Sequence, residues 1–212
     1  MSERARPWLK ICGVTNEEDA RLAADAGADA IGLNFVATSK RRVDDASARR
    51  IADAVRGRVE LVGVVANETA ERLRTLLATL ELDFLQLHGD EAPSLLAEVP
   101  RTFKAVGIAS AADVEQAARY AGERLLVDAK HGGASGGTGR RFDWSFVREL
   151  AQSRRLILAG GLTPENVAEA VTQVQPWGLD VASGVESGDP RRKDPDLVFR
   201  FIDNARRAGG ER

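Results

Sequence analysis

The sequence predicts an α/β protein, a single-domain (β/α)8 TIM barrel that spans residues 1–212. Three observations lead to this prediction: short strand-like apolar runs recur along the chain, amphipathic helical segments separate them, and no linker-like or low-complexity segment interrupts the series. Several of the runs are apolar almost throughout, which is typical of parallel strands covered on both faces. The 212 residues, 43% of them hydrophobic, suffice for one domain with a sizeable core.

The candidate strands cover eight segments, namely 8–12, 30–35, 59–65, 83–88, 102–108, 124–129, 155–160 and 178–184. Between them apolar residues repeat at helical spacing, and the two clearest stripes consist of Leu73, Leu76, Leu77 and Leu80 and of Val198, Phe201, Ile202 and Ala205. An open doubly wound sheet is the main alternative. It would be expected to carry a GxGxxG or GxxxxGK phosphate loop after its first strand, where this chain has CGVTNE.

Two helix starts have recognisable signals. Thr15 with Glu18 fits a capping box, and Thr163 followed by Pro164 fits an N-cap with proline at the first helical position. Both signals follow predicted strands. They therefore support the alternation of strands and helices that a barrel requires.

Charge and cysteine content limit the choice of partners and compartment. A net charge of -2 and a pI near 5.8 provide no general attraction to nucleic acid or to an anionic membrane, so a small molecule is the expected partner. One cysteine cannot form an internal disulfide, and there is neither a leader-like segment nor a long apolar span, which favours the cytoplasm. A monomer and a homodimer both remain open, because apolar residues that face a partner resemble those that face a core.

In a barrel the active site forms at the C-terminal ends of the strands. The polar and glycine residues predicted there are Cys12, Asn34, Asn67, His88, Asp128, Gly160, Gly161, Ser183 and Gly184. Glycine-bearing loops after the seventh and eighth strands can offer backbone N–H groups to an anion, so we predict that they bind the phosphate of a phosphorylated substrate. The alternative is that these glycines only permit tight turns.

Cys12 and Asp128 are the candidate catalytic residues. Each has an ordinary explanation by itself, a small buried apolar side chain for the cysteine and a turn residue for the aspartate. Together they place a thiol and a carboxyl group at one barrel mouth, an arrangement suited to proton transfer. His88 has only His131 as a histidine companion, so no multi-histidine metal site is predicted, and a hydrogen-bonded histidine in the site lining is preferred.

A set of motifs resembles phosphoribosylanthranilate isomerases of tryptophan biosynthesis. The resemblance runs from about Leu9 to Asn204 and is carried by KICGVTNEEDA, the SKR of ATSKRRV, LQLHGDE, KAVG, LLVDAK, GGTGRRFDW, LAGGLTPENV and LDVASGVE. It implies an Amadori rearrangement of N-(5-phosphoribosyl)anthranilate to 1-(2-carboxyphenylamino)-1-deoxyribulose 5-phosphate. It implies neither a metal nor an organic cofactor.

The same resemblance implies a role for individual residues. Asp128 would be the general acid that protonates the furanose oxygen, and Cys12 the general base that removes the C2 proton. Arg41 would hold the anthranilate carboxylate, with Arg42 as the alternative, since a guanidinium fork suits a planar carboxylate. We also count Asp180 and His88 among the residues of the substrate site. The glycine-rich segment 130–141 is expected to act as a lid.

A thiol near neutral pH is mostly protonated unless a cation favours the thiolate. Lys10 lies two residues before Cys12 and therefore faces the same side of its strand. A buried ammonium group needs a partner, and in a closed barrel the last strand lies beside the first. We therefore predict that Lys10 pairs with Asp180 beneath the site, orients Cys12 and moderates its pKa.

Two other functions stay open at this point. One is a different sugar-phosphate barrel enzyme, such as a pentose-phosphate epimerase or a two-substrate isomerase that also serves histidine synthesis. The first would be expected to have more histidines at its strand ends, and the second an aspartate where this chain has Cys12. The other function is non-catalytic binding of a phosphorylated ligand, which leaves the pairing of Cys12 with Asp128 unexplained.

Overall fold

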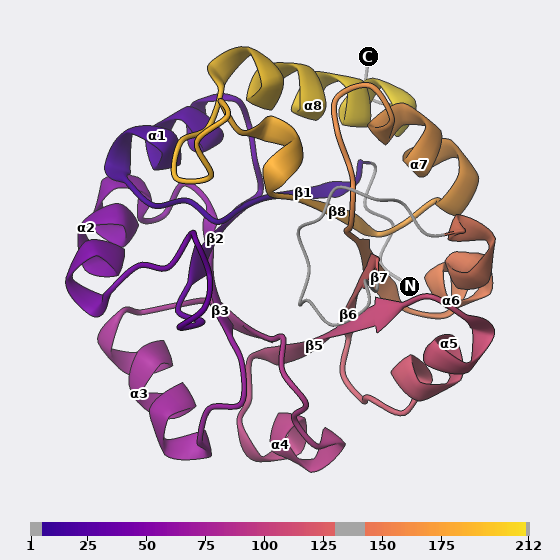
Figure 1. Ribbon diagram of the computed structural model, residues 1–212, viewed down its shortest axis with the longest axis horizontal. Coiled ribbons are helices and arrows are strands. Elements are labelled where there is room, and N and C mark those ends of the chain that lie inside the picture. Colours follow the sequence, from indigo (N-terminus) through magenta and orange to yellow (C-terminus); the bar gives the residue numbers. More distant parts are fainter. Residues whose placement is uncertain (1–5, 130–142, 211–212) are drawn as a thin grey trace.

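The computed structural model describes residues 6–129 and 143–210 and has the predicted (β/α)8 architecture (Figure 1). Eight parallel strands form a closed barrel in chain order. The strands are β1 Trp8–Cys12, β2 Ala30–Asn34, β3 Glu60–Val65, β4 Phe84–Leu87, β5 Thr102–Ile108, β6 Arg124–Ala129, β7 Arg155–Leu158 and β8 Gly178–Val181.

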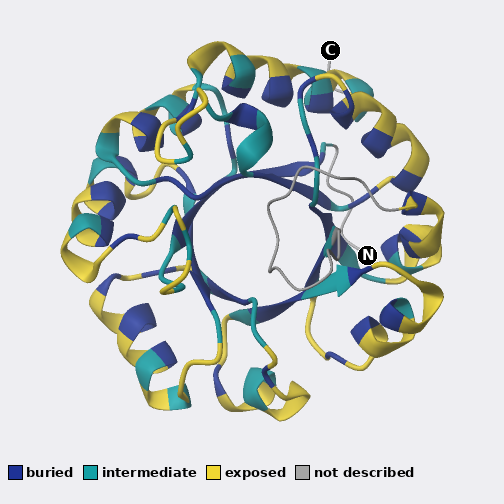
Figure 2. Ribbon diagram, viewed as in Figure 1, coloured by how far each residue is buried: buried dark blue, intermediate teal, exposed yellow. Residues whose placement is uncertain are grey.

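The helices form a ring outside the strands (Figure 1). They are α1 Glu17–Asp25, α2 Asp45–Val55, α3 Ala70–Thr79, α4 Pro93–Glu98, α5 Ala111–Ala118, α6 Arg148–Ser153, α7 Val167–Val174 and α8 Pro195–Ala208, with 3-10 turns η1 Trp144–Val147 and η2 Ser183–Val185. Figure 2 shows that the helix faces toward the strands are buried and the outer faces exposed. Both predicted helical stripes are buried at every position, which confirms their orientation.

Two predicted helix starts are wrong, and in both an asparagine side chain forms the local hydrogen bonds. The N-cap of α1 is Asn16, whose side chain accepts a hydrogen bond from the N–H of Asp19, while the hydroxyl of Thr15 donates to the carbonyl of Arg191. Helix α7 begins only at Val167, because the side chain of Asn166 folds back to accept from the N–H of Thr163 and to donate to a loop carbonyl. Asn16 thus caps α1 in place of Thr15. The Asn166 side chain forms no cap hydrogen bond to α7 and instead holds the turn that precedes this helix.

The N-terminal end of the barrel is closed by aromatic rings around one cation. Trp8 and Trp177 stack with their centroids 5.4 Å apart. The guanidinium carbon of Arg124 lies 4.0 Å from the ring centroid of Phe84 and 4.9 Å from that of Trp177, and its nitrogen bonds to Glu60 at 2.7 Å. These residues stand at or just before the first positions of their strands, so their side chains fill the barrel interior at this end.

The two phenylalanines of α8 allow a matched test of the packing. Phe201 is fully buried, whereas Phe199 is 48% exposed. We expect Phe201→Ala to lower the free energy of unfolding by about 3–5 kcal/mol, because it removes an aromatic ring from the core and leaves a cavity. Phe199→Ala should change it by less than about 0.5 kcal/mol. Urea unfolding followed by circular dichroism measures both, and equal losses would contradict the burial assigned to α8.

Candidate active site

The closed parallel barrel brings the predicted site residues to one end. Cys12 is the last residue of β1, and Asp128 is the last but one of β6. His88 directly follows β4, Gly160 and Gly161 follow the strand end of β7, and Ser183 and Gly184 lie in η2 after β8. Because all eight strands run in the same direction, these positions share the C-terminal mouth of the barrel.

The predicted pair of Lys10 and Asp180 is present. Their strands are in register at these two residues, and the Lys10 Nζ lies 2.9 Å from an Asp180 carboxylate oxygen. The same Nζ donates to the Gln86 side-chain oxygen at 2.8 Å, and the Gln86 amide nitrogen lies 3.2 Å from His88 Nδ1. A buried polar chain therefore connects β8, β1 and β4 beneath the mouth.

Burial of Lys10 opposes its charge, but the carboxylate of Asp180, with a smaller contribution from Cys12, raises the pKa of Lys10 above its ordinary value. Lys10 is therefore an ammonium ion at neutral pH even though its side chain is fully buried. This charge compensation is what a buried ionised group requires.

The electrostatic surroundings of Cys12 differ from the expectation in one respect. Burial, followed by the negative charge of Asp180, raises the pKa of the Cys12 thiol, and the cations Lys10 and Lys193 lower it by less. The prediction that Lys10 moderates this pKa is right in sign, but its effect is smaller than that of burial. In the absence of ligand the thiol form is favoured.

A glycine of the neighbouring strand makes room for the thiol. Gly32 is in register with Cys12, and a Cβ at position 32 would lie 2.7 Å from the Cys12 sulfur and 3.0 Å from Lys10 Cε. Any side chain there would push the sulfur away from its position. Cys12 keeps 8% of its surface exposed, so the mouth of the barrel reaches it.

His88 lies in the site lining as a neutral side chain. Burial, and then the positive charge of Lys104, lower the pKa of His88. Lys104 itself pairs with Glu91 at 2.9 Å and also donates to the carbonyl oxygens of Leu87 and Gly89. This second buried ion pair holds the segment that follows β4, so it fixes the backbone that carries His88.

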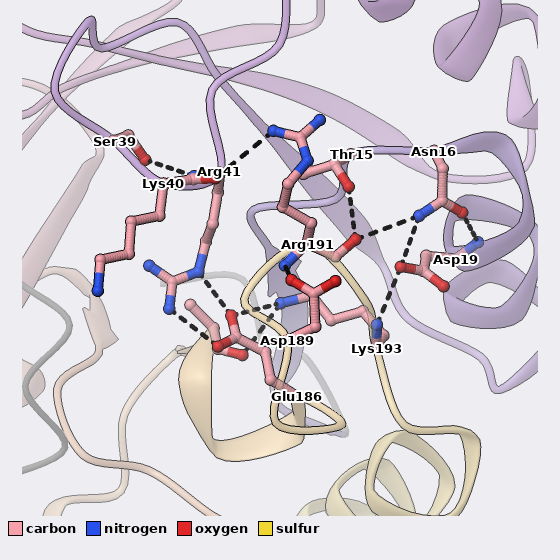
Figure 3. A network of polar contacts seen from close by, with 11 residues as sticks. Thr15, Asn16, Asp19, Ser39, Lys40, Arg41, Glu186, Asp189, Arg191 and Lys193 are labelled. Carbon is pink, nitrogen blue, oxygen red and sulfur yellow. Dashed lines mark hydrogen bonds and ion pairs between the residues drawn. The ribbon is translucent and has the colours of Figure 1, made fainter.

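Arg41 pairs with a carboxylate of the protein itself. Its Nε lies 2.5 Å from one Glu186 oxygen and its Nη2 3.1 Å from the other, and Lys193 Nζ lies 3.3 Å from Glu186 as well (Figure 3). Burial opposes the charge of Arg41, but Glu186 raises the pKa of its guanidinium. Burial lowers the pKa of Lys193, against the effect of Glu186. Arg42, the alternative to Arg41, is exposed.

Sequence reasoning did not assign a role to Glu186 or Lys193. Glu186 ends the motif SGVE, which was a usable signal, whereas Lys193 follows two arginines and no motif includes it. The segment between them crosses to the loops after β1 and β2: the carbonyl of Arg191 accepts from Thr15, and the N–H of Lys193 donates to Asp19 (Figure 3). Arg191 also donates to the carbonyls of Lys40 and Arg42, so this segment lies beside the loop that carries Arg41.

The two glycine-bearing loops contact each other. Gly160 and Gly161 both have positive φ, at 87° and 66°, where glycine is unstrained. A Cβ at Gly184 would overlap the carbonyl oxygen of Leu162, so the loops after β7 and β8 pack closely only because this position is glycine. Within the described residues the N–H of Gly161 donates no hydrogen bond.

Asp128 is in register with Gly107 of β5, and its side chain is partly exposed. The predicted lid, 130–141, lies outside the described residues.

In the part of the chain that the structure describes, no three His, Cys, Asp or Glu side chains are placed to hold a metal ion. No described helix has both the length and the apolar character needed to cross a membrane.

A closed parallel barrel with its polar groups at the C-terminal mouth and an aromatic plug at the other end places the chain among (β/α)8-barrel enzymes. Comparison with known proteins narrows this class. The family model described as N-(5'-phosphoribosyl)anthranilate (PRA) isomerase matches residues 9–204. The chain belongs to the N-(5'-phosphoribosyl)anthranilate isomerase family.

Relatives and solved structures agree with this assignment. The N-(5'-phosphoribosyl)anthranilate isomerase of Trichlorobacter lovleyi is 43% identical over 202 residues, which cover 94% of this chain and 98% of the relative. The crystal structure of phosphoribosyl anthranilate isomerase from Thermotoga maritima is 40% identical, with a TM-score of 0.87 and coverage of 94% and 98%. A phosphoribosyl anthranilate isomerase solved with reduced 1-(o-carboxyphenylamino)-1-deoxyribulose 5-phosphate is 38% identical, with a TM-score of 0.84 and the same coverage.

The opposing effects of Lys10 and Asp180 on Cys12 can be measured directly. We expect Lys10→Met to raise the pKa of Cys12, because a positive neighbour is lost, and Asp180→Asn to lower it, because a negative neighbour is lost. The rate of alkylation by iodoacetamide as a function of pH reports this pKa, and the signal has one source since Cys12 is the only cysteine. The exposed Lys40→Met serves as the control. Shifts of the same sign in both variants would contradict the assignment.

Proposed function

We propose that this isomerase uses Cys12 as general base and Asp128 as general acid in the Amadori rearrangement of N-(5-phosphoribosyl)anthranilate, a step of tryptophan biosynthesis. The observation that carries the proposal is the placement of both groups at the ends of β1 and β6, at one mouth of the barrel. The loops after β7 and β8 lie between them around the ring. A substrate phosphate held by those loops would leave its sugar between the thiol and the carboxyl group.

The reaction divides into two proton transfers. Asp128 protonates the ring oxygen of the ribose while the C1–O bond breaks, and the nitrogen lone pair forms the C=N bond of a protonated Schiff base. Cys12 then removes the C2 proton, and the C–H electron pair moves toward the cationic nitrogen to form an enolamine. The enolamine takes up a proton at C1 and loses the proton of its C2 hydroxyl, which yields the ketone product. Asp128 thus acts as a general acid and Cys12 as a general base.

The raised pKa of Cys12 is compatible with this role. The protonated Schiff base carries a positive charge beside the thiol, and a positive neighbour favours the thiolate. That charge adds to those of Lys10 and Lys193, which already act against burial and Asp180. The base is therefore generated when the intermediate that it deprotonates is present.

The loops after β7 and β8 are proposed to bind the substrate phosphate. Support comes from the contact between the loops, the positive φ of Gly160 and Gly161, and the N–H of Gly161 described above. Ser183 at the start of η2 adds a hydroxyl group at the same place. Backbone N–H groups that point to one side are a common way to bind a phosphate.

Arg41 is proposed to bind the carboxylate of the anthranilate ring. Its side chain is partly exposed and lies against Gly13, the residue that follows Cys12, which supports a position near the reacting end of the substrate. Asp180 and His88 belong to the same lining, Asp180 through Lys10 and His88 through Gln86. Arg42, the alternative, is exposed, whereas Arg41 is the arginine that packs beside Cys12.

We infer that the reaction takes place in the cytoplasm, since the substrate is a small phosphorylated metabolite and the lone cysteine is compatible with a reducing compartment.

We infer that the protein is a monomer or a homodimer. Support comes from a crystal structure that is 39% identical to this chain, with a TM-score of 0.84. It shows monomers generated from the dimeric phosphoribosylanthranilate isomerase of Thermotoga maritima.

The roles of the two catalytic groups are tested by turnover of N-(5-phosphoribosyl)anthranilate generated in situ, followed by its aryl-amine fluorescence. Cys12→Ser and Asp128→Asn should each lower kcat by about 10²-fold or more, because each removes one of the two proton-transfer groups. Circular dichroism checks that both variants are folded. A wild-type protein that binds the substrate without turnover would instead indicate a phosphate-binding barrel, and an active variant would remove that residue from the mechanism.

The pH dependence of kcat/KM tests the same base in another way. The thiol is inactive as a base and the thiolate active, so kcat/KM should rise with pH through the pKa of Cys12 in the free enzyme. Because burial and Asp180 raise that pKa, the rise should lie above the ordinary range for a cysteine thiol. Asp180→Asn should move the rise to lower pH. A wild-type rise at or below the ordinary thiol range would be inconsistent with Cys12 as the base in this environment.

A further inference from the structure

The guanidinium of Arg41 is held by only one of its edges. Nε and Nη2 form two parallel hydrogen bonds to Glu186, at 2.5 Å and 3.1 Å. In Figure 3 the third nitrogen, Nη1, lies on the side away from Glu186. Within residues 6–129 and 143–210, Nη1 forms no hydrogen bond. Arg41 therefore has a second edge with donors that a ligand carboxylate can use.

Two explanations of Glu186 have opposite consequences for the ligand. As a competitor, Glu186 would occupy Arg41 until the ligand carboxylate displaced it, and its removal would strengthen binding. As a positioning residue, it would remain bound and present the free edge of Arg41, and its removal would weaken binding. The choice depends on whether the Glu186 carboxylate can move away.

The structure favours a fixed carboxylate. The Glu186 side chain is 9% exposed, and Lys193, which is fully buried, holds it from the other side at 3.3 Å. Lys193 Nζ also donates to the carbonyl of Ala182 at 3.0 Å. If Glu186 turned away, Lys193 would be left as a buried cation without its carboxylate, which is costly.

The backbone around Glu186 is also anchored. Glu186 and Lys193 form an antiparallel bridge, and the N–H of Asp194 donates to the carbonyl of Val185 at 3.0 Å. The other end of this loop bonds to the residues around α1: Lys193 through Asp19 and Arg192 through Glu18. Gly13, directly after Cys12, provides the space for Arg41, since a Cβ there would overlap the Arg41 side chain.

We propose that Glu186, held by Lys193, is a positioning residue that orients Arg41 so that its free edge receives the carboxylate of an aromatic acid substrate. This inference rests on the role of Arg41 in the proposed function and adds the residues that determine the carboxylate preference. Glu186 touches neither the reacting carbon nor the ring oxygen. Its removal should therefore affect carboxylate recognition more than the proton transfers.

The test compares two ligands on the same protein variants. One ligand is reduced 1-(2-carboxyphenylamino)-1-deoxyribulose 5-phosphate, and the other is its counterpart without the ring carboxyl group. Titration calorimetry gives both dissociation constants for wild type, Glu186→Ala and Glu186→Gln. The glutamine keeps the side-chain volume and one oxygen acceptor, so it remains folded if the alanine does not. Glu18→Gln, which breaks the exposed bridge to Arg192 in the same loop, is the matched control.

We expect Glu186→Ala to weaken binding of the carboxylated ligand by about tenfold and of the other ligand by less than about twofold. Glu186→Gln should give a smaller loss with the same selectivity, and Glu18→Gln no selective loss. Equal losses for both ligands would show a general structural role, and tighter binding of the carboxylated ligand would show a competitor; either result overturns the proposal. A wild-type protein without a preference for the carboxylated ligand would also reject the role of Arg41, whereas a preference that persists in Glu186→Ala rejects the role of Glu186 alone.

Discussion

Closure of the barrel between β8 and β1 is the constraint on which the site depends. It puts Lys10 in register with Asp180, and it brings the loop after β8 against the loops after β1 and β2. Without this pairing the ammonium group of Lys10 would be buried without a carboxylate, at a cost of several kcal/mol. The same strand contact thus completes the fold and provides the charge beneath Cys12.

Charged residues at the mouth form two groups: Lys10 and Asp180 pair below the thiol, and Arg41 and Lys193 share the carboxylate of Glu186 beside it. Although cations are near, burial and then the charge of Asp180 raise the pKa of the Cys12 thiol by more than Lys10 and Lys193 lower it, so the thiol remains protonated without ligand. An additional positive charge from the substrate would not be compensated in this way. In the proposed mechanism, the positive charge of the Schiff base would therefore favour the thiolate of Cys12.

The parts of the site that the sequence predicted share one property. Cys12, Asp128, His88 and the glycines after β7 and β8 each stand where a strand ends, and strand ends follow from local hydrophobic patterns. Once the strands were placed, the barrel put those positions at one mouth. The start of α1 went wrong because the Thr15 side chain is bonded to a residue 176 positions away, which leaves the cap to Asn16. The start of α7 went wrong because the Asn166 side chain bonds to Thr163 and Gly161 and holds a turn before the helix.

By itself the sequence determined the order of strands and helices, the faces that pack into the core, the strand-end positions of Cys12 and Asp128, and the motifs that indicate the family. These depend on residue spacing along the chain, which needs no knowledge of distant contacts. Only the tertiary structure decided that burial outweighs Lys10 at the thiol and that Arg41 is paired with Glu186, 145 residues away. Both depend on how much water is excluded and on which loops meet, and these follow from closure of the whole barrel rather than from any local pattern.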